Sequence, residues 1–134
     1  MSIYSYQKVT DRHTTYSLAA PTAADGSPMA TELATINGMT YVHVPDRTEL
    51  PRQPSQIQIE PVQMTDDLRR AIMERSPHVQ LINRRVVGMI RERYSVNDEL
   101  KMLRIAPSEE SAAYNDYVES CRAWGREQKQ AMGL

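Results

Sequence analysis

The sequence predicts an α+β protein that is mainly helical in its C-terminal half. Seven of the eight prolines fall before residue 78, and only Pro107 lies beyond it. Proline fixes φ and removes a backbone donor, so long helices are excluded from the first half but not from the second. The first half carries a hairpin signal, and the second carries helix caps followed by apolar residues at helical spacing. We therefore expect an extended proline-rich arm over residues 1–62, with a β-hairpin at about 33–44, and a compact bundle of about four short helices over residues 63–134.

The composition argues against several classes of protein. The formal net charge is −1, whereas proteins that bind mainly to nucleic-acid phosphates usually carry a clear positive excess. No apolar run reaches the roughly 18 residues of a transmembrane helix, so we expect no membrane partner. The first residues show no basic segment followed by an apolar core, which predicts no signal peptide. Cys121 is the only cysteine, which excludes an internal disulfide and fits a reducing compartment of synthesis.

The elements predicted in the first half are short and extended. Residues 3–9 mix Ile, Tyr and Val as strands do, and residues 19–31 have the composition of a loop. Two strand-like runs flank Asn37-Gly38, and these two residues tolerate the positive φ of a type I′ turn, which predicts the hairpin. Residues 56–60 alternate between apolar and polar side chains and are bracketed by prolines, so we expect an edge strand or an extended arm. Because an isolated hairpin is marginal in water, this half should lie on the helical half, on another copy or on a different protein.

Four helix starts are visible in the second half. Each has a capping residue, followed in the first turn by acids or by proline, which the helix dipole and backbone geometry favour. Gly125 inside the last helix costs about 1 kcal/mol relative to Ala, so it either lets a neighbour approach closely or marks fraying. Roughly 70 residues of short helices bury only a modest core, and packing against a partner would compensate for this. The predicted helices follow the caps Thr65, Ser76, Ser95 and Ser108 and end near Arg75, Tyr94, Pro107 and the C-terminus.

No set of residues has the spacing of a catalytic or metal site. The three histidines, His13, His43 and His78, fall in the arm, the hairpin and a helix start. Cys121 lies on the apolar stripe of the last helix, which favours a buried structural cysteine over a nucleophile. The paired acids stand at helix starts, where capping explains them, and the five glycines form no phosphate-binding loop. We therefore expect no enzyme activity, no metal, no cofactor and no small-molecule substrate.

The helix predicted at residues 77–94 is basic, with four arginines against one glutamate. Such a helix is compatible with recognition of nucleic-acid phosphates, and equally with pairing to acids of neighbouring helices or of a partner. Because the whole chain is nearly neutral, nucleic-acid binding is the less favoured interpretation. The four arginines are Arg84, Arg85, Arg91 and Arg93.

Two stretches of the second half resemble segments of small proteins of tailed bacteriophages. One is residues 90–101 (Ile-Arg-Glu-Arg-Tyr-Ser-Val-Asn-Asp-Glu-Leu-Lys), and the other is residues 114–125, with Tyr-Asn-Asp-Tyr-Val-Glu followed after one residue by Cys-Arg-Ala-Trp-Gly. Residues 38–42 (Gly-Met-Thr-Tyr-Val), followed by Leu-Pro at residues 50–51, are similar to the extended front half of tail-fibre and baseplate accessory proteins. The resemblance covers residues 33–130 in outline through short matches. It implies a virion structural or tail-assembly role and carries over no catalytic or binding residues.

The resemblance and the arm-like first half lead to one expected function. The chain would be a virion structural protein of the tail fibre or baseplate region, made in the bacterial host cytoplasm. It would act by protein–protein contact through the helical docking domain and the extended arm. Its partners would be other virion tail proteins, with a homo-oligomer as an alternative. Competing hypotheses are a tail-fibre assembly chaperone absent from the mature virion and a nucleic-acid-binding regulator that uses the basic helix at 77–94. The residues expected to contact a partner are Tyr41, Ile57, Ile59, Arg84, Arg85, Arg91, Arg93, Tyr114, Tyr117 and Trp124.

Overall fold

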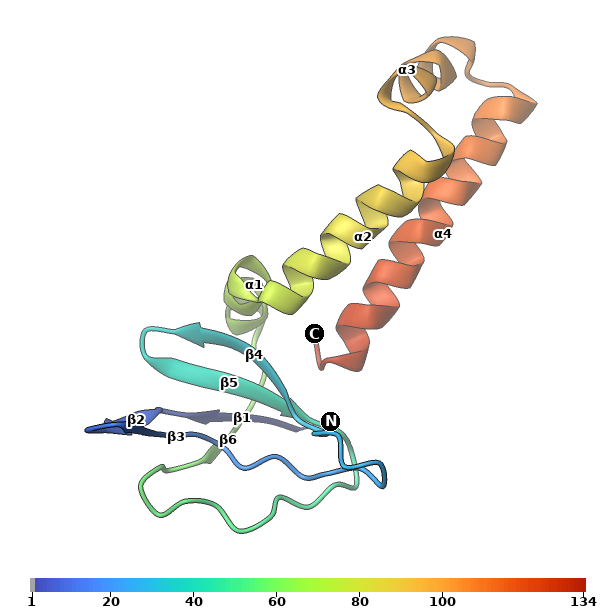
Figure 1. Ribbon diagram of the computed structural model, residues 1–134. Helices are drawn as coiled ribbons and strands as arrows, with labels where there is room; N and C mark the ends of the chain where they lie inside the picture. Colours follow the sequence, from blue (N-terminus) through green and yellow to red (C-terminus); the bar gives the residue numbers. More distant parts are fainter. Residues whose placement is uncertain (1) are drawn as a thin grey trace. The chain divides into compact units, whose positions relative to one another are not determined.

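The computed structural model describes residues 2–134 and confirms the α+β class, with a β-sheet region followed by four helices (Figure 1). Contacts within the chain define two units. The first comprises the chain up to His78 together with Met132–Leu134, and the second comprises Val79–Ala131. In chain order the elements are β1 (Ser2–Tyr6), β2 (Val9–Asp11), β3 (Thr14–Tyr16), β4 (Thr31–Ile36), β5 (Met39–Val44), β6 (Glu60–Val62), α1 (Asp66–Arg75), α2 (Pro77–Arg93), α3 (Val96–Ile105) and α4 (Glu109–Ala131).

The first unit contains a four-stranded antiparallel sheet in the order β4-β5-β1-β6. β1 lies inside the sheet, where Ile3 has His43 of β5 on one side and Val62 of β6 on the other. β2 and β3 form a separate two-stranded ribbon. Segments that were expected to run as an extended arm therefore pair with one another. The physical reason is that β1, which is far from β5 and β6 in sequence, provides both with backbone hydrogen-bonding partners.

The predicted hairpin is confirmed as β4 and β5. Asn37 and Gly38 have φ values of +51° and +81°, which is the pair of left-handed residues that a type I′ turn requires. The register shifts between Glu32 and Ala34, so that two residues of β4 occupy the place of one. The extra residue is Leu33, and its side chain is completely buried.

The strand expected at residues 56–60 starts later than its alternating pattern indicated. β6 begins at Glu60 and lies at the sheet edge. Pro61 has no backbone N–H, and an edge strand tolerates this because no further strand lies beside it. Ile57 lies instead in a turn, in which its N–H donates to the carbonyl of Pro54 at 3.4 Å. Ile57 is therefore buried although it belongs to a loop. The alternation along residues 56–60 reflects this burial and not the pairing of a strand.

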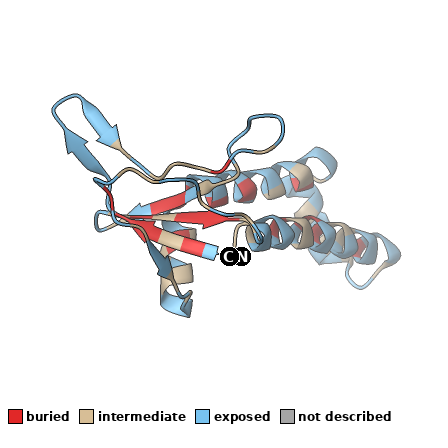
Figure 2. Ribbon diagram, turned by 90° about the horizontal axis from the view of Figure 1, so that it is seen from below, coloured by how far each residue is buried: buried red, intermediate tan, exposed pale blue. Residues whose placement is uncertain are grey.

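Both faces of the sheet are covered by apolar side chains. Successive residues of a strand point to opposite faces, so Ile3 and Tyr6 of β1 belong to two different clusters. The first cluster joins Ile3 to Ile72 of α1, and the second joins Tyr6 to Val42 and Ile57. β1 and β5 are the most continuously buried strands of the first unit (Figure 2). This unit has a core of its own.

α1 starts where its cap predicts. The Thr65 hydroxyl accepts a hydrogen bond from the Leu68 N–H at 3.2 Å. Ile72 is completely buried in the cluster on the sheet, so α1 packs on β4. The helix therefore belongs to the sheet unit, and the division after His78 lies beyond the boundary expected at residue 62.

The second unit is made of the two long helices α2 and α4 with the shorter α3 between them in sequence (Figure 1). The predicted cap of α3 is confirmed, because Ser95 and Asp98 each bind the other's backbone N–H, at 2.8 and 3.1 Å. α4 has 23 residues and is longer than the short helices expected. Cys121 is 1% exposed, which confirms the predicted burial of this residue. The buried core of the unit contains Ile90, Val118 and Cys121.

Gly125 marks a close approach of α2 and α4. It is buried, and a Cβ atom placed on it would lie 2.8 Å from Cγ2 of Val86 and 3.8 Å from Cγ2 of Ile82. Carbon atoms do not approach to 2.8 Å without a shift of one side. Of the two interpretations of this glycine, the close approach is confirmed.

Candidate functional site

Within residues 2–134, no three His, Cys, Asp or Glu side chains gather in a way that could hold a metal ion. His43 is buried in the sheet, whereas His13 and His78 are exposed. Cys121 packs against apolar neighbours in the core of the helical unit. The buried thiol of Cys121 and the buried imidazole of His43 therefore belong to different units.

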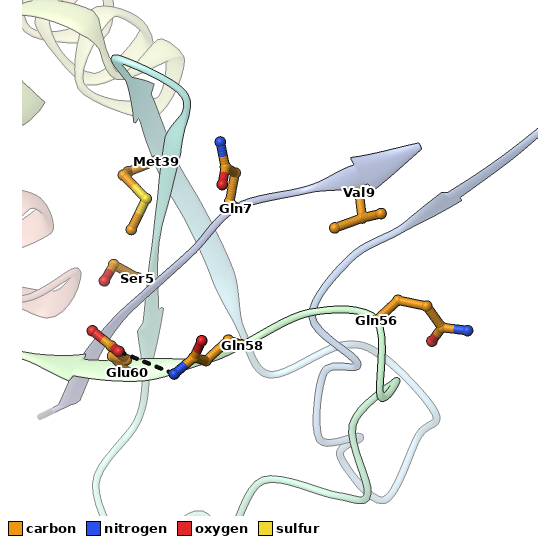
Figure 3. Close-up of a pocket in the computed structure, with 7 residues that line it drawn as sticks. All are labelled: Ser5, Gln7, Val9, Met39, Gln56, Gln58 and Glu60. Atoms are coloured by element: carbon orange, nitrogen blue, oxygen red, sulfur yellow. Dashed lines mark hydrogen bonds between the residues drawn. The ribbon is translucent and has the colours of Figure 1, made fainter. Parts of the chain in front are cut away.

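A polar cleft lies on the sheet unit beside β1 (Figure 3). The Gln58 amide donates to the Glu60 carboxylate at 3.4 Å. Glu60 is the one ionisable group among the described lining residues, so the cleft offers hydrogen bonds but no acid–base pair. The cleft is lined by Ser5, Gln7, Val9, Met39, Gln56, Gln58 and Glu60.

Three exposed apolar residues lie in one row on α3. Val96, Leu100 and Leu103 are 56%, 52% and 74% exposed. Their spacing of four and then three residues places them on one side of the helix, as in a helix–helix seam. None of the ten residues of α3, all of them described, is buried. Val96, Leu100 and Leu103 are called the outer row below.

A polar contact beside the outer row fixes α3 to both long helices. The Tyr114 hydroxyl of α4 donates to Oε1 of Glu99 at 2.8 Å, and Nη1 of Arg91 on α2 lies 3.0 Å from Oε2 of the same carboxylate. The hydrogen bond from Tyr114, supported by Arg91, holds the pKa of Glu99 below its ordinary value. Burial and the Glu99 carboxylate raise the pKa of Tyr114. α3 is thus held in place while its outer row stays exposed.

Tyrosines next to this contact pack on one another within the helical unit. The Tyr94 and Tyr114 rings meet edge to face with centroids 4.9 Å apart, and Tyr117 lies 5.8 Å from Tyr94. Cζ of Arg93 lies 4.7 Å from the centre of the Tyr117 ring. The Tyr117 hydroxyl donates to the carbonyl of Met89 at 2.8 Å, which joins α4 to α2.

The residues expected to contact a partner are distributed over both units. In the helical unit, the structure brings Arg91, Arg93, Tyr114 and Tyr117 together around the contacts just described, and it places Trp124 half-buried on α4. Their contact with a partner stays a prediction.

The other expected contact residues differ in exposure. Ile57 is buried in the sheet unit, and Tyr41 and Ile59 are half-buried against its two clusters. Arg84 and Arg85 are exposed on α2. Of these five, the two arginines have the side chains most available to a partner.

The outer row is missing from the residues expected to contact a partner. The sequence did contain a signal, because α3 carries a second apolar pair, Met102 and Ile105, which is half-buried. A ten-residue helix with apolar residues on two sides has more apolar surface than one neighbouring helix covers. Periodicity alone does not say which of the two sides faces inward.

Comparison of the chain with known protein families, with curated proteins and with solved structures gives no match. No helix among the described residues is long and apolar enough to cross a membrane.

Proposed function

We propose that this chain is a structural protein of a bacteriophage tail, in the fibre or baseplate region, and that it docks through the outer row of α3. The observation that carries the docking is the exposure of Val96, Leu100 and Leu103 on one side of a helix without a buried residue. Covering Leu100 and Leu103 with a partner would contribute roughly 1–2 kcal/mol each. The tail setting is supported by the resemblance of residues 90–101 and 114–125 to small phage proteins.

Two features favour protein contact over binding to nucleic acid. Arg91 is paired with Glu99, and Arg93 lies over the Tyr117 ring, so two arginines of the basic helix already have partners within the unit. The outer row is apolar, and apolar side chains gain little from phosphates but much from another protein surface.

Mass spectrometry of purified virions, from the phage that encodes this chain, tests the proposal. We expect the protein in gradient-purified particles at a constant ratio to the major tail proteins. A protein that binds the fibre in infected cells but is absent from finished particles would be an assembly chaperone. A protein found in neither place would contradict the proposed function.

A further inference from the structure

A groove with an apolar floor runs between α2 and α4 in the helical unit. The floor contains Val86, Val87 and the backbone of Gly125, and Val87 is 54% exposed. Because Gly125 has no side chain, Val86 can lie directly against α4 at this point. The groove has a volume of about 360 Å³, at the lower end of the usual range for binding sites. We call it the α2–α4 groove; its walls are Asn83 from α2 and Arg122, Arg126 and Lys129 from α4.

The α4 wall of this groove is cationic. Arg122, Arg126 and Lys129 follow at intervals of four and three residues, so they form one row along the helix. Glu119 lies one turn before this row, and its carboxylate binds Nη2 of Arg126 at 2.5 Å. Among the described residues, no carboxylate lies within 4 Å of the charged groups of Arg122 or Lys129. The row therefore keeps a positive excess beside an apolar floor.

We propose that the α2–α4 groove binds an acidic amphipathic helix of a partner protein. An apolar floor between two antiparallel helices accepts leucine-like side chains at intervals of three and four residues. Carboxylates on the flank of the same helix would then face Arg122, Arg126 and Lys129. A single-stranded nucleic acid would meet the same charges but no aromatic ring in the groove on which a base could stack. The inference rests on the proposed contact function, but it assigns a second surface and the chemistry of its partner.

Fluorescence anisotropy of the full chain with labelled synthetic peptides tests this assignment. The probe is a 14-residue helical peptide with leucines at intervals of three and four residues and glutamates along one flank. We expect binding that weakens with added salt, because the carboxylates meet the exposed Arg122 and Arg126 and the half-buried Lys129. Two matched peptides, with lysine for each glutamate or serine for each leucine, should bind at least tenfold more weakly.

Variants of the protein locate the site. Replacing both Arg122→Glu and Lys129→Glu should weaken binding of the acidic peptide at least tenfold. The matched control reverses the same number of charges on α3 (Lys101→Glu with Arg104→Glu) and should leave binding unchanged. Glu119→Gln releases Arg126 from its carboxylate and should tighten binding severalfold. Circular dichroism of each variant verifies that the helices are retained.

Four results would overturn the assignment. The first two are that the acidic peptide does not bind at low salt, or that the lysine peptide binds equally well. The other two are that a single-stranded oligonucleotide displaces the peptide, or that the protein forms a homodimer that Arg122→Glu with Lys129→Glu dissociates. The outer-row variant Leu100→Glu with Leu103→Glu should still bind the peptide. If the unaltered protein does not bind the acidic peptide but is incorporated normally into virions, this inference alone is overturned. If it binds the peptide but is absent from virions, the proposed function is overturned.

Discussion

At the scale of single residues, replacing each of two glycines of the helical unit with alanine should change the stability in opposite directions. A Cβ atom on Gly125 would meet Val86 at 2.8 Å, whereas a Cβ atom on Gly88 would meet nothing within 4 Å. Alanine favours a helix over glycine by about 1 kcal/mol, so Gly88→Ala should stabilise the protein by about 0.5–1 kcal/mol. Gly125→Ala gains the same propensity but must push α2 and α4 apart, and we expect a net loss of about 1–2 kcal/mol.

Urea unfolding of the two glycine variants, followed by circular dichroism, measures both changes in one experiment. Stabilisation by both alanines would contradict the close approach at Gly125.

His43 makes a prediction about pH. Its side chain is buried, and among the described residues its Nε2 atom has no hydrogen-bond partner. Burial lowers the pKa of His43 from its ordinary value of 6.5. As the pH falls through the ordinary value of 6.5, His43 takes up a proton in the unfolded chain before it does so in the folded chain. The free energy of unfolding therefore decreases.

We therefore expect the stability of the sheet unit to fall between pH 7.5 and 5.5 and this dependence to weaken in His43→Phe. Unfolding by urea at several pH values is the measurement. His13 is exposed, so His13→Gln is the control and should keep the full dependence. An unchanged pH profile in His43→Phe would show that another group is responsible.

At the scale of elements, the structure separates what local sequence can predict from what it cannot. The turn at Asn37-Gly38 and the caps at Thr65 and Ser95 were predictable, because each depends on residues within three positions of one another. The central place of β1 was not, because its pairing with β5 joins residues about 40 positions apart in sequence, such as Ile3 and His43.

The same limit applied to the candidate site. Arg91 and Tyr114 were expected to contact a partner, but in the structure both bind the carboxylate of Glu99. Glu99 lies 8 positions after Arg91 and 15 positions before Tyr114 in the sequence. Leu100 and Leu103 lie in the helix predicted after Ser95, and only the structure shows that this row faces away from the core. Periodicity predicts that a helix has an apolar side, but the neighbours of that side come from the tertiary fold.

The polar contact at Glu99 predicts a local change in α3. Tyr114→Phe removes the hydrogen bond to Glu99, which costs about 1 kcal/mol, and α3 has no buried residue to compensate. We expect faster amide hydrogen exchange across α3 with little change in the sheet unit. The control is Glu110→Gln, because Glu110 lies 3.9 Å from Lys101 in an exposed pair and should contribute little.

Hydrogen exchange followed by mass spectrometry resolves α3 from the rest of the chain. Equal exchange in Tyr114→Phe and in the unaltered protein would show that Met102 and Ile105 hold this helix without the polar contact.

At the scale of the whole molecule, the chain combines two differently constructed units. The sheet unit covers both faces of its sheet with its own residues. The helical unit has a small core and leaves apolar side chains exposed on α2 and α3. Exposed apolar surface of this kind usually marks an interaction site. We therefore propose that docking rests on the helical unit, whereas the sequence led us to expect contact through both the helical half and the extended arm.

The most direct test of this docking is the incorporation of an outer-row variant into virions. Leu100→Glu with Leu103→Glu places two charges where the partner should bury two leucines, and both positions are exposed, so folding should be retained. The matched control is Val9→Glu, an apolar residue 36% exposed on β2. Quantitative mass spectrometry of particles produced with each variant should show at least tenfold less of the outer-row variant and normal amounts of the control. Normal incorporation of the outer-row variant would contradict docking through α3.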